Sequence, residues 1–167
     1  SIHSGDREFQ VPDEYPLTAA GWRIDDNGRK FIRVKGVRWF TNIDHGRRHE
    51  PLPLMTMADN LRFSKHKELK GKTAYDRYDN YDAIEVPFTD AIPSDYDGVM
   101  GVPISFLDKY CPEQFEILGI SLELGIKKPD NLPKEKQGGP AFYIKMGTDY
   151  NRMYCRLAIR RKLTIDN

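Results

Sequence analysis

The amino-acid sequence predicts an α+β fold that is rich in β-strands and contains two or so short helices. Stretches of alternating apolar and polar residues recur along the 167-residue chain, and Gly and Pro separate them at short intervals. Helix signals are few, and internal repeats are absent from the sequence. No apolar run approaches the ~20 residues that a membrane-spanning helix needs. We therefore expect residues 1–167 to form a single region of mixed sheet.

The first quarter of the chain is expected to consist of strands. Asp26, Asn27 and Gly28 form a hairpin signal, because Asn-Gly tolerates positive φ at both central positions of a turn. The last of these strands is apolar on both faces, which is typical of an inner strand. A polar, Pro-broken loop follows it, from residue 44 to 53. The expected strands cover residues 9–11, 21–24, 30–34 and 37–43.

Two helices are expected in the middle of the chain. Thr56 and Asp59 resemble a capping box, and Gly71 lies where a helix over residues 56–69 would end. Pro103 suits the first turn of a second helix over residues 104–110, with Pro112 just beyond its end. These signals place both helices between strands.

The remaining strands are predicted from short apolar runs. Pro87 stops the first of them, and a Lys- and Pro-containing stretch over residues 125–140 is expected to be a flexible insertion. The last two runs are expected to pair with each other. The predicted strands cover residues 83–86, 115–124, 141–146 and 153–161.

Charge is sorted along the chain although its total is only +1. Residues 29–49 and 145–162 are strongly basic, and residues 75–97 are strongly acidic. The blocks could neutralise one another as solvated faces, or they could leave a basic face for a polyanion. The sequence leaves both interpretations open.

The densest cluster of reactive side chains is the loop at residues 44–50. Arg47 and Arg48 can each bind phosphate or a guanine edge through a forked guanidinium. His45 and His49 are four residues apart, which on a helix would suit a metal. Gly46 and the nearby Pro51 argue against such a helix, so no metal site is predicted.

The final predicted strand carries arginines on one face. Arg152, Arg156 and Arg160 alternate with apolar residues of the opposite face, and Tyr154 lies among them. Three guanidinium groups and a ring could hold phosphates and stack on a base. An ordinary solvated face is the alternative interpretation.

Other candidates favour structural roles. Cys111 and Cys155 are expected to be packing residues in a reducing cytosol, which indicates a cytoplasmic protein. Trp39 and Phe40 could stack on bases, although aromatic residues of an inner strand are usually core. The tyrosines at positions 75, 78 and 81 are typical of an ordered loop that its rings anchor. A metal-dependent nuclease site built from Glu85, Asp95 and Asp97 is a weaker alternative, because acidic clusters are commonly turns and caps.

The longest of four characteristic stretches is residues 92–110, which contain Tyr96-Asp97-Gly98-Val99-Met100-Gly101-Val102-Pro103. Together, the four stretches resemble the C-terminal half of the EcoRI-type adenine-specific DNA methyltransferases. Stretches in the same order over about 80 positions are far more specific than a short motif. The stretches that carry the resemblance are residues 37–50, 78–84, 92–110 and 114–119.

The resemblance implies a larger α/β enzyme that transfers a methyl group from S-adenosylmethionine to N6 of adenine in double-stranded DNA, after flipping the base out. The family's Gly-rich cofactor loop and its Asn/Asp-Pro-Pro-aromatic motif are missing from this sequence. We therefore expect the chain to be the C-terminal portion of a longer protein, to contribute target recognition, and to be inactive alone. No catalytic residue can be assigned.

The resemblance also raises the interest of the basic side chains. The expected pocket residues are Asn42 and Asp44, which would line the cofactor or target pocket. A non-enzymatic DNA- or protein-binding module is the alternative function, and the sequence does not indicate an oligomeric state. The expected DNA contacts are Arg47, Arg48, His49, Lys65, Lys67, Arg152, Arg156 and Arg160.

Overall fold

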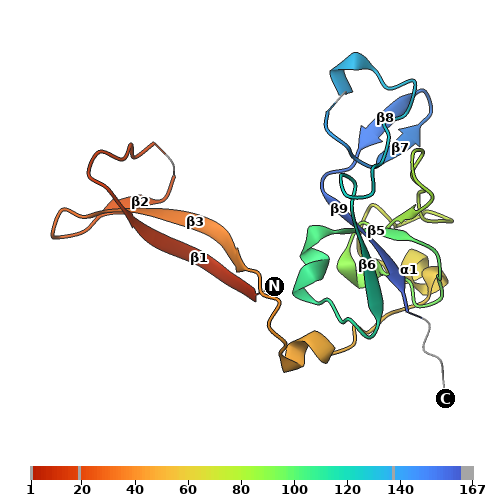
Figure 1. Cartoon of the computed structure of the whole chain (residues 1–167), viewed down its shortest axis with the longest axis horizontal. Coiled ribbons are helices and arrows are strands. Elements are labelled where there is room, and N and C mark those ends of the chain that lie inside the picture. The colour runs from red at the N-terminus through yellow and green to blue at the C-terminus, as the bar shows by residue number, and fades with distance from the viewer. Residues whose placement is uncertain (1, 19, 137, 163–167) are drawn as a thin grey trace. The chain divides into compact units, whose positions relative to one another are not determined.

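The computed structural model of the chain describes residues 2–18, 20–136 and 138–162 (Figure 1). These residues form two compact units, Ser1–Asp44 (unit 1) and His45–Asn167 (unit 2). Strands dominate both and helices are short, which confirms the predicted α+β class. No helix in the described part of the chain is long and apolar enough to cross a bilayer.

Unit 1 is an antiparallel sheet of three strands in the order β1-β3-β2. The strands are β1 (Ile2–Val11), β2 (Trp22–Ile24) and β3 (Lys30–Trp39). The predicted hairpin joins β2 to β3, but its turn is longer than Asn-Gly suggested. Only Gly28 has a positive φ, and the amide of Asp25 donates to the carbonyl of Arg29 at 3.0 Å. The turn therefore combines an ordinary first half with a single left-handed glycine.

The register gives this sheet one apolar face and one charged face. Directly opposed residues of an antiparallel sheet share a face, so Phe9, Ile32 and Trp22 lie together. On the other face, the guanidinium of Arg23 bonds to Glu8 at 2.8 Å. The apolar face, completed by Val11, Ile24 and Val34, is half exposed, because no described residue of unit 1 covers it.

The prediction of an inner strand over residues 37–43 is wrong beyond Trp39, where β3 ends. The side chains of Trp39, Phe40 and Ile43 are 62%, 64% and 72% exposed. Apolar residues on both faces of a strand suggested a second layer on each side. Within the described residues of unit 1, neither layer is present.

Unit 2 is built on a four-stranded sheet in the order β4-β5-β9-β6 (Figure 1). The strand β9 is antiparallel to both of its neighbours, whereas β4 and β5 are parallel. Because β5 and β9 each pair with two strands, they are the inner strands of the sheet. The four strands are β4 (Ile84–Glu85), β5 (Met100–Pro103), β6 (Phe115–Ile120) and β9 (Arg156–Arg161).

The predicted pairing of the last two apolar runs is wrong. The strand β7 (Tyr143–Met146) pairs instead with β8 (Asp149–Arg152), and β9 follows separately. Gly147, with φ +64°, allows the chain to reverse directly after β7. Because of this tight turn, residues 149–152 pair with β7, whereas residues 153–161 were predicted to do so.

The first predicted helix is confirmed at its start and shorter at its end. The hydroxyl of Thr56 accepts the amide of Asp59 at 3.1 Å, as the capping box requires. The helix α1 (Met57–Phe63) stops six residues early, because Ser64 adopts extended backbone. Leu69 reaches the core from a separate turn, in which its amide donates to the carbonyl of His66.

Four short 3-10 helices complete the elements that the structure describes, and two further differences from the predictions lie near η3 and at the end of β6. The predicted second helix is present as the 3-10 helix η3 (Ile104–Asp108), which ends two residues earlier than expected. The strand β6 ends at Ile120 rather than 124, because Leu124 donates to its carbonyl in a turn that Gly125 completes with φ +61°. The others are η1 (Gly46–His49), η2 (Thr89–Ala91) and η4 (Lys134–Lys136).

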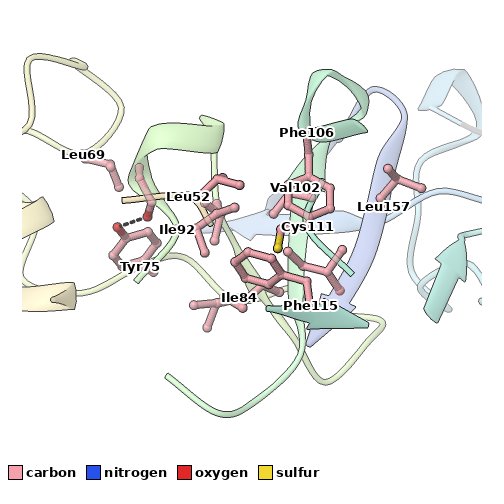
Figure 2. Packing of buried hydrophobic residues seen from close by; sticks show 14 residues of the cluster. Leu52, Leu69, Tyr75, Ile84, Ile92, Val102, Phe106, Cys111, Phe115 and Leu157 are labelled. Carbon is pink, nitrogen blue, oxygen red and sulfur yellow. Dashed lines mark hydrogen bonds between the residues drawn. The ribbon is translucent and has the colours of Figure 1, made fainter. Parts of the chain in front are cut away.

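The main core of unit 2 lies along this sheet (Figure 2). Phe106 and Phe115 meet edge to face with ring centroids 5.3 Å apart. The Tyr75 hydroxyl donates to the carbonyl of Ala91 at 2.6 Å, so this tyrosine anchors its loop as predicted. Cys111 is buried in the same cluster, whereas Cys155 is exposed and is not the packing residue that we expected.

The side-chain amide of Asn80 helps to join the β7–β8 hairpin to the rest of unit 2. The side-chain nitrogen of Asn80 donates to the carbonyls of Lys127 and Ala141, at 2.8 and 2.9 Å. Its oxygen accepts the amide of Tyr143 at 2.9 Å. The flexibility of residues 125–140 stays a prediction, although Ile126 and Leu132 within them are buried.

Candidate nucleic-acid interface

The predicted basic loop contains the 3-10 helix η1. Gly46 begins it, and the amide of Arg48 donates to the carbonyl of His45 at 2.9 Å. The side chain of Arg47 is exposed and that of Arg48 is half-buried. The turn therefore carries an exposed guanidinium group at Arg47 beside the half-buried Arg48, and guanidinium groups have the chemistry that phosphate recognition needs.

The Nδ1 atom of His49 lies 2.6 Å from the carboxylate of Glu113. This hydrogen bond is the main reason why the pKa of Glu113 lies below its usual value, and the Cys111 thiol adds a second at 3.2 Å. His45 precedes η1 with extended backbone, so the two imidazoles do not share an α-helical face. In the described part of the chain, no three His, Cys, Asp or Glu side chains gather as a metal site would require.

The prediction that Lys65 and Lys67 lie on a helix face is wrong, because α1 ends at Phe63. Both are exposed in the turn that follows. His66 between them has contacts of a different kind: its ring stacks on Phe88 at 3.5 Å, and its Nε2 lies 3.1 Å from Asp90. The turn thus exposes two lysines while its histidine is held by contacts within unit 2.

The three predicted arginines are not on one strand. Arg152 belongs to β8, whereas Arg156 and Arg160 belong to β9. Arg160 is exposed and bonds to Glu116 at 2.8 Å. Their separation follows from the tight turn at Gly147, and the predicted row of three guanidinium groups is therefore wrong as geometry. Contact of each residue with DNA stays a prediction.

Arg156 forms the most buried ion pair of the described residues. Its Nε and Nη2 atoms bond to Oε1 of Glu85 at 3.0 and 2.8 Å, and the two side chains are only 14% and 5% exposed. The hydroxyl of Tyr78 donates to the same carboxylate. Burial, together with the charge of Glu85, raises the pKa of Tyr78 far above its usual value. This arrangement makes Arg156 and Glu85 structural partners.

This role of Glu85 was not predicted from the sequence. A signal was present, because Glu85 is the one charged residue within the apolar run at 83–86. A buried carboxylate requires a cationic partner. Nothing in the spacing identifies that partner, which is 71 residues away.

Beside the ion pair lies a cleft of about 650 Å³ between the β7–β8 hairpin and the loop around residue 70. Of the predicted DNA contacts, only Arg156 lines it. Its wall is mixed, with Phe88 and Met153 among apolar residues and Lys72 and Lys145 among charged ones. The full lining is Glu68, Leu69, Lys72, Asp76, Glu85, Pro87, Phe88, Ile144, Lys145, Met146, Asn151, Met153 and Arg156.

The expected pocket residues lie in unit 1. Asn42 and Asp44 are exposed in the segment that follows β3. Their part in a cofactor or target pocket stays a prediction. Two of the three acids of the alternative nuclease site have other partners: Glu85 pairs with Arg156, and Asp95 accepts the amide of Met57 at 2.7 Å.

The family model for the adenine-specific methyltransferase EcoRI matches residues 1–162. The chain belongs to this family. The predicted resemblance is thereby confirmed over nearly the whole chain, including the first strands and the last ones, where the family's pattern was least evident.

Three proteins named as type II methyltransferases are similar to this chain in sequence. The type II methyltransferase M.EcoRI of Escherichia coli is 43% identical over 122 residues, which are 73% of this chain and 34% of the relative. M.MgeORF184P of Mycoplasma genitalium is 40% identical over 92 residues, 55% of this chain and 26% of the relative. M.MpnI of Mycoplasma pneumoniae is 36% identical over 95 residues, 57% and 27% of the two chains. The chain thus spans about a third or less of these relatives, and no solved structure matches it.

Proposed function

We propose that the protein is a site-specific DNA methyltransferase that transfers a methyl group from S-adenosylmethionine to N6 of adenine, and that this chain supplies target recognition. The match of the adenine-specific methyltransferase family to residues 1–162 carries the proposal. The curated relatives are named as type II methyltransferases, which supports double-stranded DNA as the substrate and a place in a restriction-modification system.

The exposed basic side chains support a recognition role. On the compact turn η1, Arg47 is exposed and Arg48 is half-buried, and Lys65 and Lys67 are exposed in the segment after α1. Cations on rigid turns can neutralise phosphates without first being ordered, so less entropy opposes binding. Of the remaining predicted contacts, Arg152 and Arg160 are exposed, and Arg156 is committed to Glu85.

The described residues do not fit the methyl donor. A donor site of this class needs a Gly-rich loop that connects a parallel strand to the start of a helix. The described parallel strands β4 and β5 are followed by 3-10 helices, η2 and η3, with prolines at the junctions. We therefore derive no catalytic step for this chain and propose that it is inactive by itself.

The activity is tested with the intact methyltransferase that contains this chain. It should transfer labelled methyl groups from S-adenosylmethionine to duplex DNA, and the product should be N6-methyladenine. DNA that is already methylated at N6 of its target adenines should accept no label. Label on cytosine, or methylation by the isolated 167-residue chain, would contradict the proposal.

The proposed role in DNA recognition is tested at η1 (Gly46–His49), called the basic turn below. Replacing Arg47 and Arg48 by Ala should weaken DNA binding about tenfold or more, since each guanidinium offers charge-assisted hydrogen bonds. The log–log salt slope should also become shallower by about 0.9 for each phosphate that the variant no longer neutralises. Affinity for S-adenosylmethionine should not change. Equal losses of both affinities would mean that the turn is structural, and a flat salt response would exclude the basic patches as the contact surface.

A further inference from the structure

The basic turn is connected to one short segment, Cys111-Pro112-Glu113-Gln114, by contacts at its end and just beyond it. The carboxylate of Glu113 lies 2.6 Å from Nδ1 of His49, the last residue of η1. Leu52 lies three residues after His49, and the neighbouring residue of the segment holds it. The side-chain oxygen of Gln114 accepts the amide of Leu52 at 2.8 Å, and its nitrogen donates to the carbonyl of Leu52 at 2.9 Å. The segment therefore holds both the end of the turn and the chain that leaves it.

This segment is itself fixed to the sheet. Gln114 directly precedes β6, whose first residue, Phe115, is fully buried. The carbonyl of Gln114 accepts the amide of Lys162 at 2.9 Å, just after β9, and Leu52 is buried in the main core. The anchor of the turn is thus part of the rigid frame of unit 2, and the turn cannot move far without breaking these contacts.

The charge of Glu113 is informative because it is unfavourable for the proposed function. An exposed carboxylate bonded to the last residue of an arginine-containing turn adds a negative charge that repels the DNA backbone. If the side chain were a simple surface acid, its loss would improve DNA binding. If Glu113 instead holds the turn in place, its loss would weaken DNA binding.

We propose that Glu113 and Gln114 are positioning residues that set the geometry of the Arg47–Arg48 turn for phosphate contact. The proposal rests on the proposed function and adds residues to it that contact no DNA themselves. Glu113 acts through His49, and Gln114 acts through the backbone of Leu52. Loss of either lets the turn shift and weakens its hold on phosphate.

The decisive variant is Glu113→Gln in the intact methyltransferase. We expect about two- to five-fold weaker binding to duplex DNA, the range that exposed ion pairs provide. The salt slope should become shallower, which a role in stability alone would not produce at temperatures where the variant is folded. Tighter binding, or an unchanged Kd with an unchanged slope, would overturn the proposal.

Glu116→Gln is the matched control. It removes a similarly exposed carboxylate, paired with Arg160 at 2.8 Å, from the same stretch of chain. Its DNA binding should be unchanged or tighter. Gln114→Leu tests the second anchor, with thermal unfolding to show that the variant is folded, and it should also weaken binding and flatten the slope. Unchanged binding by a folded Gln114→Leu variant would overturn the role of Gln114.

A double-mutant cycle separates this proposal from the proposed function. In a background that already carries Arg47→Ala and Arg48→Ala, Glu113→Gln should have no further weakening effect on DNA affinity. A full additive loss would overturn the positioning role. If Arg47→Ala and Arg48→Ala themselves left DNA affinity unchanged, the recognition role of the turn would fail instead.

Discussion

The buried pair of Arg156 and Glu85 shows how one residue can serve structure although its type suggested binding. Replacing Arg156 by Met should destabilise unit 2 by about 3–5 kcal/mol, because it leaves a desolvated carboxylate without its cation. Urea unfolding followed by far-UV circular dichroism measures this change.

The matched control for that variant is Arg160→Met on the same strand. Both partners of the Arg160–Glu116 pair are about half exposed, so its loss should cost less than about 1 kcal/mol. Similar losses for the two arginines would show that Glu85 is not buried in solution.

Tyr75 links stability to alkaline pH. Burial is the main cause that raises the pKa of its hydroxyl to about 12, from about 10 in an unfolded chain. The folded state therefore favours the neutral hydroxyl, and this contribution is complete below pH 10 and is lost as the pH rises from 10 to 12.

The measurement is the free energy of unfolding between pH 9 and 12. Wild type should lose stability over this window, and Tyr75→Phe should show a smaller decline. The slope that remains belongs to Tyr78, Tyr110 and the Cys111 thiol, whose pKa values are also raised. An identical slope in Tyr75→Phe and wild type would rule out this source.

At the level of elements, local chemistry could be predicted and pairing could not. The capping box at Thr56, the hairpin near Gly28 and the anchored tyrosine loop are set by neighbouring residues, and each is present. The partner of β9 depends instead on segments more than 35 residues away. The strands β1 and β5 were the least visible, since β1 is mostly polar and β5 is only four residues long.

The half-exposed apolar face of the unit 1 sheet makes an element-scale prediction. Contiguous exposed apolar side chains bind hydrophobic dyes such as ANS. In the isolated chain, Trp22→Ser should reduce dye fluorescence, because Trp22 lies opposite Ile32, which itself lies opposite Phe9 on the same apolar face. Leu122→Ser removes an isolated exposed side chain of unit 2 and should have little effect. Equal effects of the two would contradict the assignment.

For the whole molecule, the division into two units predicts two unfolding events. Every buried hydrophobic residue that the structure describes lies at Leu52 or later, whereas both tryptophans, Trp22 and Trp39, lie in unit 1. In urea, tryptophan fluorescence should therefore change at a lower concentration, and with a smaller m-value, than the circular dichroism of the whole chain. Coincident transitions would mean that the units unfold together.

The candidate site shows the same limit at this scale. Residue types identified the basic turn at Arg47, because charge density is visible in sequence. They did not identify its anchor, since Glu113 is 64 residues from His49 and is chemically an unremarkable surface acid. Nor did they show that Arg156 is committed to Glu85, because that depends on which strands the fold brings together.

The two hydrogens of the Asn80 amide have a consequence for how this protein can vary. They bond to the carbonyls of Lys127 and Ala141, so one side chain holds both ends of the segment between those residues. Lengthening a loop whose ends are already tied costs only about 0.6 kcal/mol for each doubling. Insertions at exposed positions between 127 and 141 should consequently be tolerated among natural variants, whereas loss of the buried Leu132 side chain or of the side chain at position 80 should not.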